Sequence, residues 1–457
     1  MITPEGAPIL TAEAMRRAEA TAIAAGASVD GLMARAGAGV AEWVRRLAGD
    51  HAILVLCGPG NNGGDGYVAA CALKASGCRV RIAASGDPGS AAASRARQGW
   101  DGPVAALADA GPAPVVVDAL FGTGLSRPLD PVLSARLGAL VAAASLAIAV
   151  DVPSGLASDD GAMLGDVPCF DVTLALGAAK PSHLLQPAAR HVGALRVVDI
   201  GVPGDDRWSI IARPDLALPG PEAHKYNRGM VAVCAGSMPG AALLAATAAL
   251  RAGAGYALVL GGAGGGPLAI VHKPFVAASL ADPRIGAILI GPGLGRDAIA
   301  RARLDAVLAL DRPTVIDGDA LHLIDPARLA GRQSATILTP HGGEFDAAFG
   351  TNEGSKIERA LAAAAAAGAV IVFKGADTVV AAPDGRVGIA LPASSWLSTA
   401  GTGDVLAGGI AALLAGGAAP FDAACGGVWL HGEAARRCGG AFIADDLASA
   451  LSHVRGG

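Results

Sequence analysis

Three short polar loops in the first half of the chain carry residues that could bind a nucleotide and move a proton. They are Gly58–Gly66, Asp118–Arg127 and Asp151–Leu156, and each follows an apolar run that is typical of a buried strand. Glycine-rich turns at helix starts let backbone amides approach a phosphate, and asparagine and aspartate supply fixed oxygen ligands. Ordinary solvated turns use the same residue types, but loops of this length in α/β units are usually functional. We therefore expect the three loops to meet at one ligand crevice.

Three oxygen-bearing side chains of these loops, Asn62, Asp118 and Ser154, could surround one cation. A single negative charge among neutral oxygens suits a monovalent ion better than Mg²⁺ or Zn²⁺. Asp151 is the candidate general base or acid, and the alternative is a strand-end carboxylate that caps a turn. Lys180 is one of only six lysines and follows another strand, but a surface position suits it equally well.

Taken in this order, the loops resemble those of the NAD(P)H-hydrate epimerase domain, over roughly residues 9–203. The resemblance implies a Rossmann-like fold that interconverts the R and S epimers of the hydrated cofactor, NAD(P)HX, at ring atom C6. It also implies that Asp151 is catalytic and that K⁺ is held by Asn62, Asp118 and Ser154. The implied substrate-binding residues are Asn61, Asn62, Gly63, Gly64, Asp65, Gly122, Thr123, Gly124, Leu125, Ser126, Arg127 and Pro128.

A second glycine-rich helix start, Thr399–Gly408, lies in the C-terminal half. The amides of Gly401–Gly403 could form an anion hole where charge develops on a transferring phosphoryl group. Asp404 would sit in the first helical turn, positioned to take a proton from a substrate hydroxyl. The alternative is an ordinary helix N-cap by Thr402 with a favourable first-turn carboxylate. No GxxxxGK[ST] motif is present, which excludes a P-loop NTPase.

Other strand-end loops of this half carry further candidates, at Gly291–Gly295, Leu338–Glu344 and Lys374–Thr378. Taken alone, His341 could be an ordinary loop histidine and Lys374 a solvated charge, and Asp317 and Asp319 could be structural. Together with His224–Gly229 and Gly240–Ala242, these loops resemble the ADP-dependent NAD(P)H-hydrate dehydratase, a ribokinase-like fold, over about residues 224–447.

This second resemblance implies that Asp404 is catalytic and that Mg²⁺ accompanies the ADP. It implies hydrate binding by Ala241, Gly293, Gly295 and His341. It implies nucleotide binding by Lys374, Gly375, Ala376, Asp377, Thr378, Gly401, Thr402 and Gly403. One segment departs from the family pattern, because residues 261–274 are glycine-rich and lack the expected acidic stretch. That departure puts the local sheet edge in question.

Length and pattern predict two α/β domains. Of the 457 residues, 52% are hydrophobic and only 4% aromatic, so the cores must be built from Ala, Val, Leu and Ile. Apolar runs alternate with Ala-rich helical stretches, which predicts mostly parallel sheets covered on both faces. We expect a Rossmann-like three-layer α/β/α domain at residues 1–212 and a ribokinase-like α/β/α domain at 213–457. The linker is expected in the stretch that runs from Gly201–Asp206 to Pro221.

The expected elements follow the apolar runs. A helical stretch is expected at 11–48, a helix after the first loop from Tyr67, another from Ser355, and a hairpin turn at Asp384-Gly385. Strands are expected at 53–57, 79–84, 115–118, 146–151, 171–176, 195–200, 230–235, 285–291, 314–317, 336–338 and 370–374.

Composition also excludes several classes of function. A net charge of −5 gives no electrostatic basis for binding nucleic acid or acidic membranes, and the most apolar window is interrupted by Arg251 and several glycines. Seven scattered cysteines without a CxxC motif suggest buried free thiols in a reducing compartment. The first 20 residues lack the apolar core of a signal peptide. We expect a cytoplasmic homo-oligomer.

The sequence thus predicts a bifunctional repair enzyme that acts on NAD(P)HX and ADP and yields AMP, phosphate and NAD(P)H. It leaves open ADP against ATP and NADHX against NADPHX. One alternative is a ribokinase-like small-alcohol kinase fused to a K⁺-dependent nucleotide-binding domain. Another is a non-catalytic nucleotide-binding or partner-recruiting module in the first half.

Overall fold

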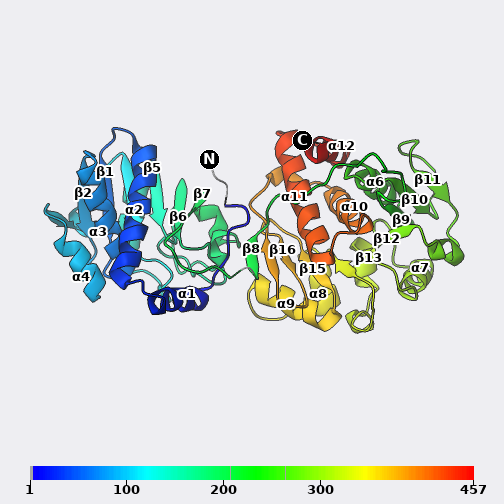
Figure 1. The fold of residues 1–457 in the computed structure, drawn as a ribbon, viewed down its shortest axis with the longest axis horizontal. Helices are drawn as coiled ribbons and strands as arrows, with labels where there is room; N and C mark the ends of the chain where they lie inside the picture. Colours follow the sequence, from blue (N-terminus) through cyan, green and yellow to red (C-terminus); the bar gives the residue numbers. More distant parts are fainter. Residues whose placement is uncertain (1–3, 206, 263, 457) are drawn as a thin grey trace. The chain divides into compact units, whose positions relative to one another are not determined.

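The computed structural model describes residues 4–205, 207–262 and 264–456 and divides into two compact units, Met1–Ile210 and Ile211–Gly457 (Figure 1). The division falls within the proline-punctuated stretch that the sequence indicates as a linker. Asp206 of that stretch and Ala263 of the glycine-rich segment lie outside the described residues, as do both chain ends.

The first unit is built on a parallel sheet with the strand order β3-β2-β1-β4-β5-β6-β7. The strand order reverses between β1 and β4, and such switch points form ligand crevices at the carboxyl ends of the strands. The strands are β1 (Ile53–Cys57), β2 (Val80–Ala84), β3 (Val104–Ala106), β4 (Val115–Ala119), β5 (Leu146–Val150), β6 (Val172–Leu176) and β7 (Ala194–Val198), and a short β8 (Trp208–Ile210) ends the unit.

Helices cover both faces of this sheet, and alternate residues of each central strand point to opposite faces. In β1, Ile53 and Val55 belong to a cluster with residues of α2 and α3, whereas Leu54 and Leu56 belong to a cluster with residues of α5. The three-layer α/β/α prediction is therefore confirmed for this unit. The helices are α1 (Ala12–Ala24), α2 (Val29–Ala48), α3 (Asn61–Ala75), α4 (Ala91–Gln98) and α5 (Pro131–Ala142).

Helix α3 begins earlier than predicted. We expected a loop through Gly66, but residues from Asn61 onward are helical. The glycines serve close packing instead of a long turn. A Cβ added to Gly63 would lie 1.9 Å from the carbonyl oxygen of Gly58, and one on Gly64 would lie 2.5 Å from Cε of Met33. Only glycine lets α3 start this close to the end of β1.

The second unit has its own sheet, in which the strands run β11-β10-β9-β12-β13-β14-β15-β16-β17. The pairings from β11 to β15 are parallel, and β15-β16 and β16-β17 are antiparallel, so the predicted hairpin at Asp384-Gly385 is confirmed. The strands are β9 (Met230–Cys234), β10 (Tyr256–Leu260), β11 (Val271–Lys273), β12 (Ile285–Ile290), β13 (Thr314–Ile316), β14 (Thr336–Leu338), β15 (Val370–Phe373), β16 (Val379–Ala381) and β17 (Val387–Ile389).

Ala-rich helices pack closely in this unit. A Cβ on Gly408 of α10 would lie 2.2 Å from the carbonyl oxygen of Ala245 in α6, so these two helices approach almost to backbone contact. Residues of α6, α10, α11 and α12 share one hydrophobic core with the sheet. The helices are α6 (Pro239–Arg251), α7 (Ala298–Leu308), α8 (Gly342–Phe349), α9 (Lys356–Ala367), α10 (Thr402–Ala415), α11 (Pro420–Cys438) and α12 (Ala444–Gly456).

The sequence analysis missed two strands at one end of this sheet. Strand β10 follows α6 after only four residues, so its apolar run merges with the apolar helix. Strand β11 closes the glycine-rich segment and pairs with β10, so the sheet edge forms despite the missing acidic stretch. Within the part of the chain that the structure describes, no helix has the length and hydropathy needed to cross a membrane.

Candidate active sites

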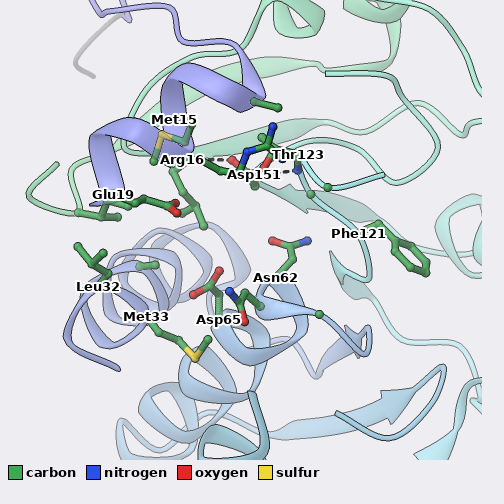
Figure 2. Close-up of a pocket in the computed structure, with 18 of the residues that line it drawn as sticks. Met15, Arg16, Glu19, Leu32, Met33, Asn62, Asp65, Phe121, Thr123 and Asp151 are labelled. Carbon is green, nitrogen blue, oxygen red and sulfur yellow. Dashed lines mark hydrogen bonds between the residues drawn. The ribbon is translucent and has the colours of Figure 1, made fainter. Parts of the chain in front are cut away.

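A cavity of about 500 Å³ lies in the first unit, at the carboxyl ends of β1, β4 and β5 and beside α1 and α2 (Figure 2). The switch point of the sheet thus coincides with a ligand-sized hollow, as expected for an open α/β sheet. Of the predicted residues, those that line it are Asn61, Asn62, Asp65, Gly122, Thr123, Gly124, Leu125 and Asp151.

Five predicted binding residues do not line this cavity. Gly63 and Gly64 are buried in the first turns of α3, where their role is packing. Ser126, Arg127 and Pro128 are exposed beyond the lining part of the same loop. The cavity wall instead includes helical side chains that the sequence analysis missed, because a helix pattern does not show which face borders a ligand site. They include Met15, Arg16 and Glu19 of α1 and Met33 of α2.

Asp151 is held by a buried lysine. The Nζ atom of Lys180 lies 2.5 Å from Oδ1 of Asp151 and also donates to the carbonyl oxygens of Leu176 and Ala178. Lys180 is 0% exposed, so the surface alternative is wrong for this residue. Burial alone would raise the pKa of Asp151, but the charge and hydrogen bond of Lys180 outweigh it and hold that pKa below its usual value.

The backbone also directs Asp151 toward the cavity. Its φ of 64° lies in the left-handed region, which non-glycine residues rarely adopt. Its carbonyl oxygen accepts a hydrogen bond from Nε2 of buried His183 at 2.7 Å, and its Oδ2 accepts one from the Thr123 amide at 3.2 Å. An unusual backbone conformation held by specific partners is characteristic of functional sites.

Two further carboxyl groups share the cavity with Asp151. Asp65 enters from α3 and is 8% exposed, and Glu19 enters from α1 (Figure 2). Burial, together with the negative charges of Asp151 and Glu19, raises the pKa of Asp65 well above its usual value. The cavity therefore contains carboxyl groups with opposite protonation preferences, an arrangement typical of acid–base catalysis.

The three residues expected to hold K⁺ lie beside this cavity. Asp118 is fully buried and accepts hydrogen bonds from the amide and hydroxyl of Ser154, at 3.0 and 2.8 Å, and from the Leu120 amide at 3.0 Å. Burial still raises the pKa of Asp118 to about 6. The amide nitrogen of Asn62 donates to Val150, but its buried Oδ1 has no partner within the described ranges. An unsatisfied buried oxygen and a buried carboxylate at the ends of the neighbouring strands β1 and β4 are groups that a bound cation could satisfy.

A second polar cluster lies in the other unit, around Lys374 at the end of β15. Its Nζ atom lies 2.8 Å from Oδ1 of Asp317 and 3.5 Å from Oε2 of Glu344, and the Thr339 hydroxyl donates to the same Asp317 oxygen at 2.7 Å. A Cβ on Gly403 would lie 3.4 Å from Nζ of Lys374, so the lysine borders the glycine-rich start of α10.

Asp404 of α10 is embedded in this cluster. Burial is the main reason that its pKa rises to about 7, and the negative charge of Asp317 adds to this while Lys374 opposes it. A carboxyl group whose pKa lies near neutrality can both accept and release a proton at the pH of a cell. Asp404 is thus suited to act as a base.

The start of α10 is open to an anion. Gly401 is the N-cap in a left-handed conformation with φ 91°, and no side chain caps the helix. The hydroxyl of Thr402 instead lies within bonding distance of the carbonyl oxygens of Leu397 and Thr399, so the alternative of a Thr402 N-cap is wrong. Nε2 of half-buried His431 donates to the Thr402 carbonyl oxygen at 2.9 Å and holds this turn from α11. Uncapped amides at a helix N-terminus bind phosphate well.

The residues of the second unit that are predicted to bind the hydrate have different surroundings. A Cβ on Gly293 would lie 3.0 Å from Cβ of Ala241, so these two predicted residues are neighbours. The amide of Gly295 donates to Oδ2 of Asp319 at 2.9 Å. His341 is exposed, and its Nδ1 caps α8 by accepting the Gly343 amide at 3.0 Å. His341 thus has a structural role in addition to any contact with a ligand.

Among the nucleotide candidates, Asp377 and Thr378 already have protein partners. Nζ of Lys356 lies 2.5 Å from Oδ1 of Asp377, and the Thr378 hydroxyl donates to the carbonyl of Gly375 at 3.0 Å. Gly375 and Ala376 are exposed. Within the described ranges no group of three or more His, Cys, Asp and Glu side chains is arranged to hold a metal ion.

Comparisons with known proteins identify both halves of the chain. A family model described as NAD(P)H-hydrate dehydratase matches residues 231–454, and one described as YjeF-related protein N-terminus matches residues 29–182. The bifunctional NAD(P)H-hydrate repair enzyme Nnr of Thermofilum pendens is 35% identical, with 88% of this chain and 86% of that protein covered. The protein of the same name from Salinibacter ruber is 34% identical, with 98% and 96% covered.

A solved structure also aligns with part of the chain. It is an ADP/ATP-dependent NAD(P)H-hydrate dehydratase from Bacillus subtilis that was co-crystallised with ATP and Mg²⁺. It is 32% identical with a TM-score of 0.46, and the alignment covers 52% of this chain and 93% of that chain.

Proposed function

The chain belongs to the family of bifunctional NAD(P)H-hydrate repair enzymes, and we propose that it restores hydrated NADH and NADPH in two successive reactions. We assign epimerisation to a domain at residues 1–212 and dehydration to a domain at residues 213–457. The observation that carries the proposal is that each unit has its own acid–base carboxyl group beside a loop suited to a phosphate. These groups are Asp151 in the first unit and Asp404 in the second.

The first site suits epimerisation at C6 of the hydrated ring, because this reaction needs a held ring and a group that exchanges a proton. Asp151 would face the ring as an ionised base, stabilised by Lys180. Asn62, Asp118 and Ser154 would hold K⁺, which would offset the buried charge of Asp118 and tie the three loops together. The amides of Gly122 and Gly124 would bind the pyrophosphate of the substrate, whereas the Thr123 amide donates to Asp151.

The second site suits ADP-dependent dehydration of the S epimer. Asp404 takes the proton of the C6 hydroxyl, and that oxygen attacks the terminal phosphoryl group of ADP, which releases AMP. The amides of Gly401–Gly403 stabilise the negative charge that develops on the transferred group. Phosphate then leaves C6 as a C5 proton is lost, and the dihydropyridine ring of NAD(P)H is restored. Mg²⁺ bound with the nucleotide would supply further charge neutralisation.

Lys374 is the strongest nucleotide-binding candidate, since its ammonium group borders Gly403 and is held by Asp317 and Glu344. The candidates Gly375, Ala376, Asp377 and Thr378 form the turn that follows it, and Gly401, Thr402 and Gly403 form the start of α10. ADP is the proposed phosphoryl donor.

We propose that the protein acts in the cytoplasm, where a reducing environment suits its seven free cysteines. The homo-oligomer expected from the sequence stays a prediction that sedimentation analysis would test.

The decisive experiment gives the purified protein a mixture of R and S NADHX with K⁺ and Mg²⁺, with and without ADP. The absorbance of reduced nicotinamide is then followed. We expect full ADP-dependent recovery. Asp151→Ala should consume the S epimer and then slow to the spontaneous epimerisation rate, measured without enzyme. Asp404→Ala should epimerise without recovering NADH.

Other outcomes contradict the proposal. Loss of both reactions in either folded variant would refute the assignment of one reaction to each unit. No recovery with ADP or ATP, together with a stable phosphorylated small alcohol in a substrate screen, would establish the kinase alternative instead.

A further inference from the structure

The carboxyl group of Asp65 stands out in the first cavity because it is largely buried and has no partner among the described residues. The residue is 8% exposed and lines the cavity from α3. Within the part of the chain that the structure describes, neither a hydrogen bond nor an ion pair engages its side-chain oxygens. A largely buried carboxyl group without a protein partner is costly, and because Asp65 lines the cavity, a ligand bound there could supply the missing partner.

Asp151 in the same cavity has the opposite environment. Its carboxylate is paired with fully buried Lys180, and it enters from the turn after β5, whereas Asp65 enters from α3 (Figure 2). The other charged groups that line the cavity are Arg16 and Glu19, both on α1. The cavity therefore offers one carboxylate that is stabilised as an ion, Asp151, and two carboxyl groups whose pKa values are raised, Asp65 and the less buried Glu19.

Resting on the epimerisation proposed above, we propose that Asp65 is a second catalytic residue, which protonates the departing C6 hydroxyl while Asp151 serves as the base. The geometry supports this division, because two carboxyl groups from different elements border the space in which the ring would lie. Burial and the nearby carboxylates favour the protonated form of Asp65, and Lys180 favours the ionised form of Asp151.

C6 carries both a hydroxyl group and ring N1, so it is a carbinolamine carbon that can lose and regain water. Asp65 transfers its proton to the C6 hydroxyl, the C6–O bond breaks, and the lone pair of ring N1 forms a C6=N1 double bond as water leaves. Water then adds to the other face of C6, the N1 lone pair is restored, and Asp151 takes the released proton. One proton has moved from Asp65 to Asp151; the opposite conversion returns it, and in one-way turnover proton exchange with solvent restores both groups.

The test uses the full-length protein and compares Asp65→Asn with Asp50→Asn, an exposed aspartate before β1 that does not line the cavity. Epimerisation of R NADHX is measured in water enriched in ¹⁸O, corrected for the spontaneous rate. We expect Asp65→Asn to lower kcat by about 100-fold or more with little change in KM, as for loss of a general acid. Asp50→Asn should match the wild type, and the wild type should incorporate solvent ¹⁸O at C6 as it epimerises.

Three outcomes would overturn the inference: an unchanged kcat in Asp65→Asn, an effect confined to KM, or wild-type epimerisation without ¹⁸O incorporation. The last measurement needs no variant, so it decides the question even if Asp65→Asn does not fold. If the wild type does not epimerise at all, the proposed function fails instead. ADP-dependent dehydration of pure S NADHX should stay unchanged in Asp65→Asn.

Discussion

At the scale of single residues, Lys180 determines the charge state of Asp151. Lys180→Met removes the positive charge but keeps an unbranched apolar side chain, so burial would dominate and raise the pKa of Asp151. We expect epimerisation at pH 7 to fall by at least 100-fold and to recover partly as the pH rises and Asp151 ionises. Breaking a buried ion pair should also lower the free energy of unfolding by about 3–5 kcal/mol. Kinetics across pH and thermal unfolding measure both effects.

A matched control is Lys74→Met, because Lys74 pairs with Asp101 at 2.6 Å on the surface. An exposed pair contributes little, so this variant should keep its activity and lose at most about 1 kcal/mol. A Lys180→Met protein with normal epimerisation at pH 7 would show that Asp151 does not depend on this lysine.

Asp404 makes dehydration depend on pH. Its pKa of about 7 means that roughly half of the molecules carry the ionised base at neutral pH. The base must be ionised, so kcat/KM for dehydration of S NADHX should reach a plateau above about pH 7 and fall about tenfold per pH unit well below it. The measurement is a kcat/KM profile from pH 5 to 9 at saturating ADP. A flat profile would contradict the assignment of Asp404 as the base.

At the scale of elements, the junction of β1 and α3 depends on glycine. A Cβ on Gly63 would lie 1.9 Å from the backbone oxygen of Gly58, which cannot move aside without disturbing β1. We expect Gly63→Ala to destabilise the protein by several kcal/mol, about as much as overpacking a core, and to abolish epimerisation. Denaturant unfolding measures the stability.

The control for this element is Gly138→Ala in α5. No atom lies within 4 Å of a Cβ at Gly138, and its helical setting favours alanine by about 0.5–1 kcal/mol. The two substitutions make the same chemical change in two helices, but Gly63→Ala should lower the free energy of unfolding and Gly138→Ala should raise it. Equal effects would show that close packing at Gly63 is not the cause.

The elements also show what the sequence can predict. Most strands were predicted within one or two residues, because their buried apolar runs end at polar loops such as Asp118 and Asp151. Strand β10 was missed because α6 and β10 form one apolar stretch. The sequence did not show whether Lys180 is buried or exposed, because its burial depends on how β6 packs against its neighbours. Likewise, Arg16 and Glu19 border the cavity only through the tertiary packing of α1.

At the scale of the whole molecule, the described residues of each site come from a single unit. The first cavity is lined only by residues between Ala12 and Ile200, and the second cluster lies between Asp317 and Asp404. Mixing Asp151→Ala and Asp404→Ala proteins should therefore restore ADP-dependent recovery of R NADHX, since the S epimer can pass through solution. Recovery no faster than with Asp151→Ala alone would show that transfer requires both sites in one chain.

The left-handed backbone at Asp151 influences which single mutations at this position leave the fold intact. Asparagine and glycine tolerate that conformation well, and each is one nucleotide change away from aspartate. Either mutation would preserve the turn while removing the base. The position is therefore a point at which a single mutation converts a repair catalyst into a folded protein that still binds its nucleotide but no longer turns it over.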